Sequence, residues 1–91
     1  MGFFGPTKKH VSKNEMKDVR ARLYANGFDE TDIHFVEVVF RADLDEHEPE
    51  QAGIDEAEIT SAISWLRHHP HHHHLSDTKL STLEKVLRGE L

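Results

Sequence analysis

The sequence contains no cysteine among its 91 residues. Disulfide bonds, thiolate zinc sites and cysteine nucleophiles are therefore excluded. The chain also lacks a run of about 18 consecutive apolar residues, the length that spans a bilayer. Its first six residues are too short and too weakly charged to form a secretory signal peptide. We therefore expect a water-soluble, cytoplasmic protein without a membrane partner.

Recognisable catalytic motifs are missing as well. There is no glycine-rich phosphate loop, no His-Glu-x-x-His motif and no serine in a nucleophile-elbow context. We therefore expect no enzyme activity, no catalytic residue and no cofactor-binding residue. The net charge of −6 and the aromatic content of 8% also argue against a nucleic-acid partner.

What the chain does have is one short sequence pattern, called a phrase below, that occurs four times. An apolar residue precedes a Ser or Asp, and a second apolar residue follows four positions after that Ser or Asp. This is the pattern of a hydrophobic staple around a helix N-cap. The four phrases are Val11-Ser12-Lys-Asn-Glu-Met16, Phe28-Asp29-Glu-Thr-Asp-Ile33, Ile54-Asp55-Glu-Ala-Glu-Ile59 and Leu75-Ser76-Asp-Thr-Lys-Leu80.

These phrases predict an all-α, compact four-helix domain of two helix pairs joined by an acidic loop. The expected helices cover residues 12–26, 29–44, 55–69 and 76–89, and residues 1–11 form an N-terminal tail before the single domain of residues 12–91. Asn26 and Gly27 predict a left-handed stop for the first helix, and His69 followed by Pro70 predicts the end of the third. The short turn between the first two helices predicts that they are antiparallel neighbours.

Apolar residues recur on one face of each expected helix, as in amphipathic helices that bury one side. Tyr24 and Trp65 lie at the edges of these faces. The predicted core consists of Met16, Val19, Leu23, Phe28, Ile33, Val36, Phe40, Ile59, Ile63, Leu66, Leu80, Leu83 and Leu87.

Charge is distributed unevenly along the chain. Residues 1–27 hold six Lys or Arg against two acids, whereas residues 28–67 hold two against twelve. Lys9, Lys13, Lys17 and Arg20 share one face of the first helix, which could meet a phosphate backbone or an acidic partner. We favour the interpretation that this basic face lies against the acidic middle of the same fold.

The acidic middle resembles an EF-hand. The segments Phe40-Arg-Ala-Asp-Leu-Asp45 and Gly53-Ile54-Asp-Glu-Ala-Glu58-Ile59 place an acidic loop between two helices. The resemblance implies a helix-loop-helix shape and calcium binding by oxygen ligands, with Asp43, Asp45, Asp55 and Glu58 as the candidates. With Glu58 at the twelfth loop position, only Asp55 and Glu58 fit the ligand register, and Gly53 stands at seven instead of six. The alternative is a solvated connector whose acids favour the start of the third helix.

A second metal candidate is a histidine-rich segment interrupted by Pro70. Its six imidazoles are expected to bind zinc, nickel or copper. A native metal site would need ligands that are spaced on rigid elements, whereas consecutive histidines in a loop would be neither spaced nor held. Both a metal-binding role and an incidental loop stay open. The candidate ligands are His68, His69, His71, His72, His73 and His74.

These features lead to one functional hypothesis and one alternative. The first is a small protein-interaction module, monomeric or weakly dimeric, whose unknown protein partner contacts the acidic loop or an uncovered apolar face between helices. The alternative is a divalent-metal-binding protein that uses the histidine segment for transition metals or the acidic loop for calcium.

Overall fold

The computed structural model describes residues 10–41 and 53–91. These residues form four α-helices, α1 (Lys13–Ala25), α2 (Glu30–Val39), α4 (Glu56–His68) and α5 (Asp77–Gly89). A short 3-10 helix, η1 (Pro70–His72), lies between α4 and α5, and two strands of two residues, β1 (His10–Val11) and β2 (Ile54–Asp55), precede α1 and α4. The all-α four-helix architecture is therefore confirmed. Within the described ranges, none of the helices has the length and apolarity required to cross a membrane.

Each helix begins directly after a predicted N-cap. The Asp55 Oδ1 atom accepts the Glu58 N–H at 2.7 Å, and the Glu58 Oε1 atom accepts the Asp55 N–H at 2.9 Å. Ser12 and Glu15 form the same reciprocal capping box, as the sequence predicts. In α2 the box is closed by Asp29 and Asp32, a pair that the sequence reasoning did not identify. The predicted second helix, residues 29–44, is too long, because α2 ends at Val39 with Phe40 as its C-cap; residues 42–44 lie outside the described residues.

The end of α1 follows the left-handed stop that Asn26 and Gly27 predict. Gly27 has a φ of 91°, and the Phe28 N–H donates to the Leu23 carbonyl at 3.0 Å while the Gly27 N–H donates to the Tyr24 carbonyl at 3.1 Å. These two hydrogen bonds form a Schellman motif, which satisfies carbonyls that the helix end would otherwise leave unpaired.

The first and third N-cap phrases meet in a short antiparallel strand pair that the sequence reasoning missed. Val11 lies opposite Ile54, His10 lies opposite Asp55, and the side chains of Val11 and Ile54 are fully buried. The predicted N-terminal tail of residues 1–11 is therefore too long, because His10 and Val11 are part of the fold. A Cβ atom on Gly53 would lie 2.7 Å from the Val11 carbonyl oxygen, so only glycine permits this close approach.

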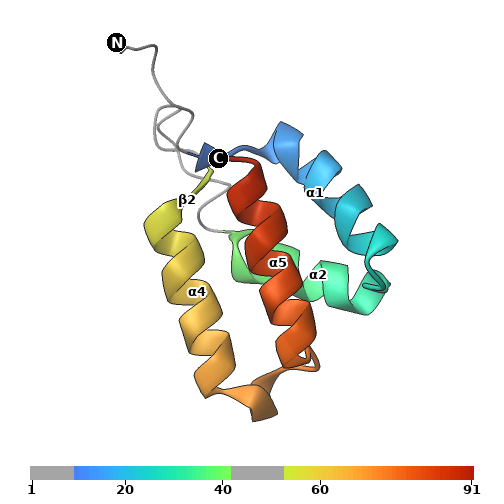
Figure 1. Ribbon diagram of the computed structural model, residues 1–91, viewed down its shortest axis with the longest axis vertical. Coiled ribbons are helices and arrows are strands. Elements are labelled where there is room, and N and C mark those ends of the chain that lie inside the picture. Colours follow the sequence, from blue (N-terminus) through green and yellow to red (C-terminus); the bar gives the residue numbers. More distant parts are fainter. Residues whose placement is uncertain (1–9, 42–52) are drawn as a thin grey trace.

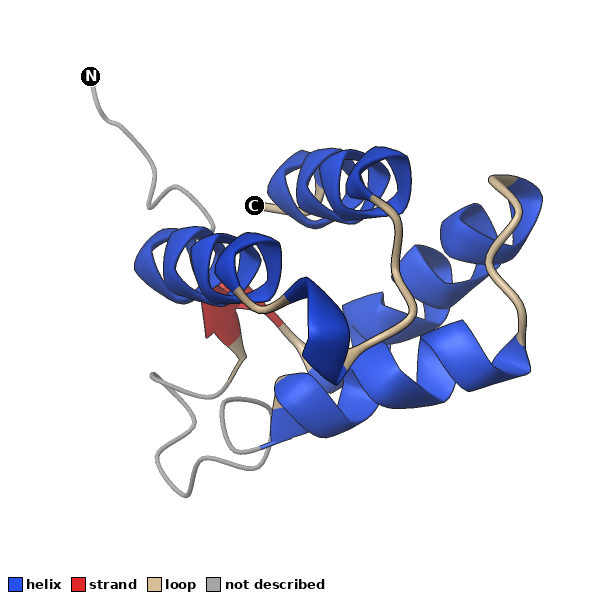
Figure 2. Cartoon of the chain, turned by 90° about the horizontal axis from the view of Figure 1, so that it is seen from below, coloured by secondary structure: helices blue, strands red, loops and turns tan. Residues whose placement is uncertain are grey.

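The helices pack around a single hydrophobic core. Helix α5 contacts both α4 and α1, whereas α1 and α2 diverge from their shared turn and are not close antiparallel neighbours (Figure 1). Figure 2 shows the four helices around one interior, with the strand pair close to the start of α4. All thirteen predicted core residues are buried, and the cluster also includes Val11, Ile54, Leu75 and Val86.

Candidate functional site

An ion pair between a buried carboxylate and a partly exposed lysine links α2 to α5. The Lys79 Nζ atom lies 2.6 Å from the Asp32 Oδ2 atom, and the Asp32 side chain is only 7% exposed. Burial raises the pKa of the Asp32 carboxyl, but the hydrogen bonds from Lys79 and from the backbone at Asp29, with the lysine charge, outweigh it and hold this pKa below the ordinary 3.8. Lys79 also lies over the Phe28 ring, 5.5 Å from its centroid.

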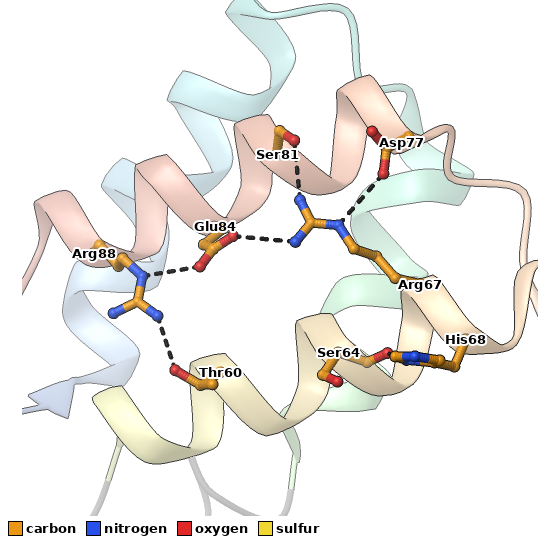
Figure 3. Close-up of polar contacts among 8 residues, drawn as sticks. All are labelled: Thr60, Ser64, Arg67, His68, Asp77, Ser81, Glu84 and Arg88. Atoms are coloured by element: carbon orange, nitrogen blue, oxygen red, sulfur yellow. Dashed lines mark hydrogen bonds and ion pairs between the residues drawn. The ribbon is translucent and has the colours of Figure 1, made fainter.

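The outer face of the α4–α5 pair is closed by two arginines (Figure 3). Arg67 binds Ser81 at 3.0 Å and Asp77 at 3.3 Å. Arg88 donates to the Thr60 hydroxyl at 2.8 Å and to Glu84 at 3.1 Å, and Glu84 also lies 3.6 Å from Arg67. The shared carboxylate of Glu84 joins both arginines into one polar ladder, defined here as the α4–α5 ladder. The guanidinium groups of Arg67 and Arg88 are therefore already hydrogen-bonded within the fold.

The α1–α2 pair leaves an open groove instead. Its cavity volume is about 410 Å³, and the residues that line it come from both helices. We refer to it below as the α1–α2 groove. It is lined by Arg20, Tyr24, Glu30, Ile33, His34 and Glu37.

The walls of this groove combine one exposed aromatic ring with charged side chains. Tyr24 is 44% exposed, whereas Ile33 is buried. Arg20 of α1 forms an ion pair with Glu37 of α2 across the groove. This contact places one basic residue against the acidic middle of the chain, as we expected for the basic face of the first helix. Arg22 of α1 instead pairs with Asp18 on the same helix at 3.0 Å.

The predicted acidic-loop ligands are placed only in part. Asp43 and Asp45 lie outside the described residues. Asp55 and Glu58 flank the start of α4, where their carboxylates accept hydrogen bonds from each other's backbone N–H groups. In the described structure these two residues therefore act as a helix cap.

His73 is the most tightly integrated residue of the histidine segment. Its Nδ1 atom accepts the Leu75 N–H at 3.1 Å, so its Nε2 atom carries the proton and donates to the Leu66 carbonyl at 2.7 Å. Its ring also stacks on Phe35 of α2 with centroids 5.9 Å apart. His73 thereby ties the end of α4 to the start of α5 and to α2.

Of the other histidines, His69 and His72 contact the ring of Trp65, and His68 has a backbone contact. The Nδ1 atoms of His68 and His69 donate to the Ser64 and Trp65 carbonyls, each at 2.7 Å. The His69 ring stacks on Trp65 with centroids 4.1 Å apart, and His72 completes the cluster. Within the described ranges, no three His, Asp or Glu residues converge as a set of metal ligands.

Sequence reasoning did not select Tyr24 or Trp65 as site residues, although it placed both at the edges of apolar faces. Their position at the edge of an apolar face could have identified them as site residues, because a large aromatic side chain there is only partly covered by packing. Trp65 is 48% exposed. The α2 side of the groove and His72 of η1 belong to other elements, which the helical pattern alone does not place.

Comparisons with known proteins add no assignment to this chain. No family model, no curated protein and no solved structure matches it. The functional proposal therefore rests on the residues themselves.

Proposed function

We propose that this protein is a small protein-interaction module that binds a segment of its partner in the α1–α2 groove. The observation that carries this proposal is the groove itself, which is open, has a volume of about 410 Å³ and contains the exposed ring of Tyr24. Grooves between helices bind peptide segments by accepting apolar side chains along one face of the segment.

The residues of the groove support a protein partner. Interfaces combine an apolar centre with a polar rim, and tyrosine and arginine are over-represented among the residues that dominate binding energy. Here Tyr24 supplies exposed apolar surface, while Arg20, Glu30 and Glu37 supply charges of both signs. A segment with one apolar side chain flanked by charged residues matches this arrangement.

The contrast with the α4–α5 ladder gives further support. In the ladder, both arginines bind several side chains of their own fold, so a partner would have to break those contacts first. In the groove, Tyr24 needs no such rearrangement, because its ring is already exposed. A partner can therefore bind there without unfolding any element.

The test is photo-crosslinking from Tyr24 in the cell. We replace Tyr24 with the photoreactive residue p-benzoylphenylalanine and place the same residue at Trp65 as the matched control. Trp65 has a similar exposed fraction, 48% against 44%, and lies on α4, outside the groove. We expect a discrete adduct from position 24 that excess unlabelled wild-type protein competes away and that excess Tyr24→Ala protein does not.

Two results would overturn the proposal. One is an equal set of adducts from positions 24 and 65, which would indicate collision and not docking. The other is equal competition by wild-type and Tyr24→Ala protein, provided that circular dichroism shows both to be folded.

A further inference from the structure

The 3-10 helix η1 spaces two histidines of the tract in a way that the sequence reasoning did not foresee. His69 precedes η1, Pro70 is its first residue, and the His72 N–H donates to the His69 carbonyl at 3.0 Å. This hydrogen bond closes one 3-10 turn, with His69 as its N-cap and His72 as its last residue. Proline also fixes the backbone angle φ at the first position. His69 and His72 are therefore both spaced and held.

The rings of these two histidines meet against Trp65. The His69 and His72 centroids are 5.6 Å apart with an interplanar angle of 66°. Trp65 stacks on His69 with an interplanar angle of 16°, and its centroid is 5.8 Å from that of His72. The indole thus forms one wall of a cluster that contains two imidazoles.

The ring nitrogens of this pair are suited to metal binding. His69 donates its Nδ1–H to the Trp65 carbonyl at 2.7 Å, so in the neutral ring the Nε2 atom carries the lone pair. Metal-binding histidines commonly donate their other ring N–H to a backbone carbonyl in this way. For His72, neither ring nitrogen has a hydrogen bond within the described part of the chain, so either can serve as ligand.

The separation of the rings agrees with a shared cation. A nitrogen–metal distance of about 2.0–2.1 Å places each imidazole centroid about 3.2 Å from the metal. Two rings at a tetrahedral or slightly wider angle then have centroids about 5–6 Å apart. The observed separation of 5.6 Å falls in this range.

We propose that His69 and His72 form a two-imidazole site for a divalent transition metal beside Trp65, with water in the remaining coordination positions. Copper, nickel and zinc are the ions that imidazole ligands favour. This site is independent of the α1–α2 groove, with which it shares no residue.

The same geometry separates His71, His73 and His74 from the site. Both ring nitrogens of His73 are already hydrogen-bonded within the fold, so His73 is a structural residue and not a ligand. His71 and His74 are exposed, and the described structure gives their rings no stacking partner. They provide matched controls, because each removes one imidazole of the same segment.

The test is a titration with nickel chloride that monitors tryptophan fluorescence. Trp65 is the single tryptophan of the chain, so quenching by the paramagnetic ion reports on this cluster. We expect saturable quenching of the wild type. His72→Ala should weaken the apparent affinity about tenfold or more, whereas His71→Ala and His74→Ala should change it less than about twofold.

A second readout guards against altered stacking of Trp65 in the variants. Isothermal titration calorimetry with zinc chloride should show the same order of affinities, and it requires no fluorophore. Saturating zinc should also raise the melting temperature of the wild type and of His71→Ala but not of His72→Ala. Equal weakening by all single substitutions, or retained affinity in the double variant His69→Ala/His72→Ala, would overturn the proposal.

Discussion

The α4–α5 pair and the α1–α2 pair begin with the same type of N-cap but have different outer faces. Between α4 and α5, Arg67 and Arg88 bind side chains on the facing helix and share Glu84 (Figure 3). Between α1 and α2, the described contacts include the single Arg20–Glu37 ion pair, and a groove of about 410 Å³ stays open beside it.

This difference shows that a cap determines where a helix begins but not what covers its sides. Helix α5 packs against both α4 and α1, so the apolar faces of those helices are buried without closing the space between α1 and α2. The polar ladder then occupies the outer face of one pair. The outer face of the other pair stays open, which is why we propose the α1–α2 groove as the binding site of the partner.

The largest test of this comparison concerns one glycine beside each helix pair, Gly53 before α4 and Gly27 before α2. Gly53 precedes β2 and α4, has a φ of 118° and would bring a Cβ to 2.7 Å from the Val11 carbonyl oxygen. Gly27 lies in the α1–α2 turn, has a φ of 91°, and has no atom within 4 Å of a Cβ. We expect Gly53→Ala to lower the free energy of unfolding by about 3 kcal/mol, since backbone strain and a clash add.

Gly27→Ala is the control and should cost only about 1 kcal/mol, the penalty of a left-handed backbone without a clash. Urea denaturation of both variants measures the difference. Equal losses would mean that the strand pair adapts to a methyl group, and that the strands constrain the start of α4 less than the Gly53 contact implies.

Much of the fold could be predicted from local sequence. N-caps at Ser12, Asp29, Asp55 and Ser76 are local signals, because the cap and its hydrogen-bond partner lie three residues apart. Core positions also follow from the helical period, and Leu83 is an example of a buried residue that the period identifies.

The strand pair and the ion pair between Asp32 and Lys79 could not be predicted in this way. Val11 and Ile54 each belong to a strand of two residues, too short to show an alternating pattern. Asp32 and Lys79 are 47 residues apart, and a helical pattern places a polar residue on the surface unless its partner is known.

The α1–α2 groove was also not predictable from local sequence. The groove combines Arg20 and Tyr24 of α1 with residues of α2, and its opening depends on how the two helices diverge. For the histidine segment, the candidate ligands could be read from the sequence, but their arrangement in space could not. Pro70 was a usable signal, because proline favours the first position of a helical turn.

The next largest effect should come from the ion pair between Asp32 of α2 and Lys79 of α5. Lys79→Met keeps an unbranched apolar stem but removes the cation that pairs with Asp32. We expect a loss of about 2 kcal/mol, because a buried carboxylate would lose its charged hydrogen-bond donor. Lys85→Met on the exposed side of the same helix is the control, with a change within about 0.5 kcal/mol. Chemical denaturation measures both, and similar losses would show that the pair is not what couples α2 to α5.

The same ion pair predicts a dependence of stability on pH. The pKa of Asp32 is lower in the folded protein than the ordinary 3.8, so the unfolded state binds the proton more tightly. The stability that this carboxylate contributes is present above pH 3.8 and is lost as the pH falls through the folded pKa. Urea titrations between pH 6 and about pH 2 should therefore show a steeper acid loss for the wild type than for Asp32→Asn. Parallel curves for the two proteins would contradict this assignment.

The smallest expected effect compares an arginine of the α4–α5 ladder with the arginine of the groove. Arg88 bonds Thr60 and Glu84, so Arg88→Ala should cost about 0.5–1 kcal/mol, the upper range for a partly exposed network. Arg20→Ala removes one exposed ion pair with Glu37 and should cost less than about 0.5 kcal/mol.

Measuring both variants, Arg88→Ala and Arg20→Ala, at high salt distinguishes the two arginines more sharply. Arg88 has a hydrogen bond to the neutral hydroxyl of Thr60 in addition to its ion pairs with Glu84 and Glu56, whereas Arg20 has the exposed ion pair with Glu37. At about 1 M salt the screening length falls to about 3 Å, so the Arg20→Ala difference should vanish while part of the Arg88→Ala difference persists. If both differences vanish together, the ladder is only a set of surface charges, and the distinction between a closed and an open helix pair then rests on apolar packing alone.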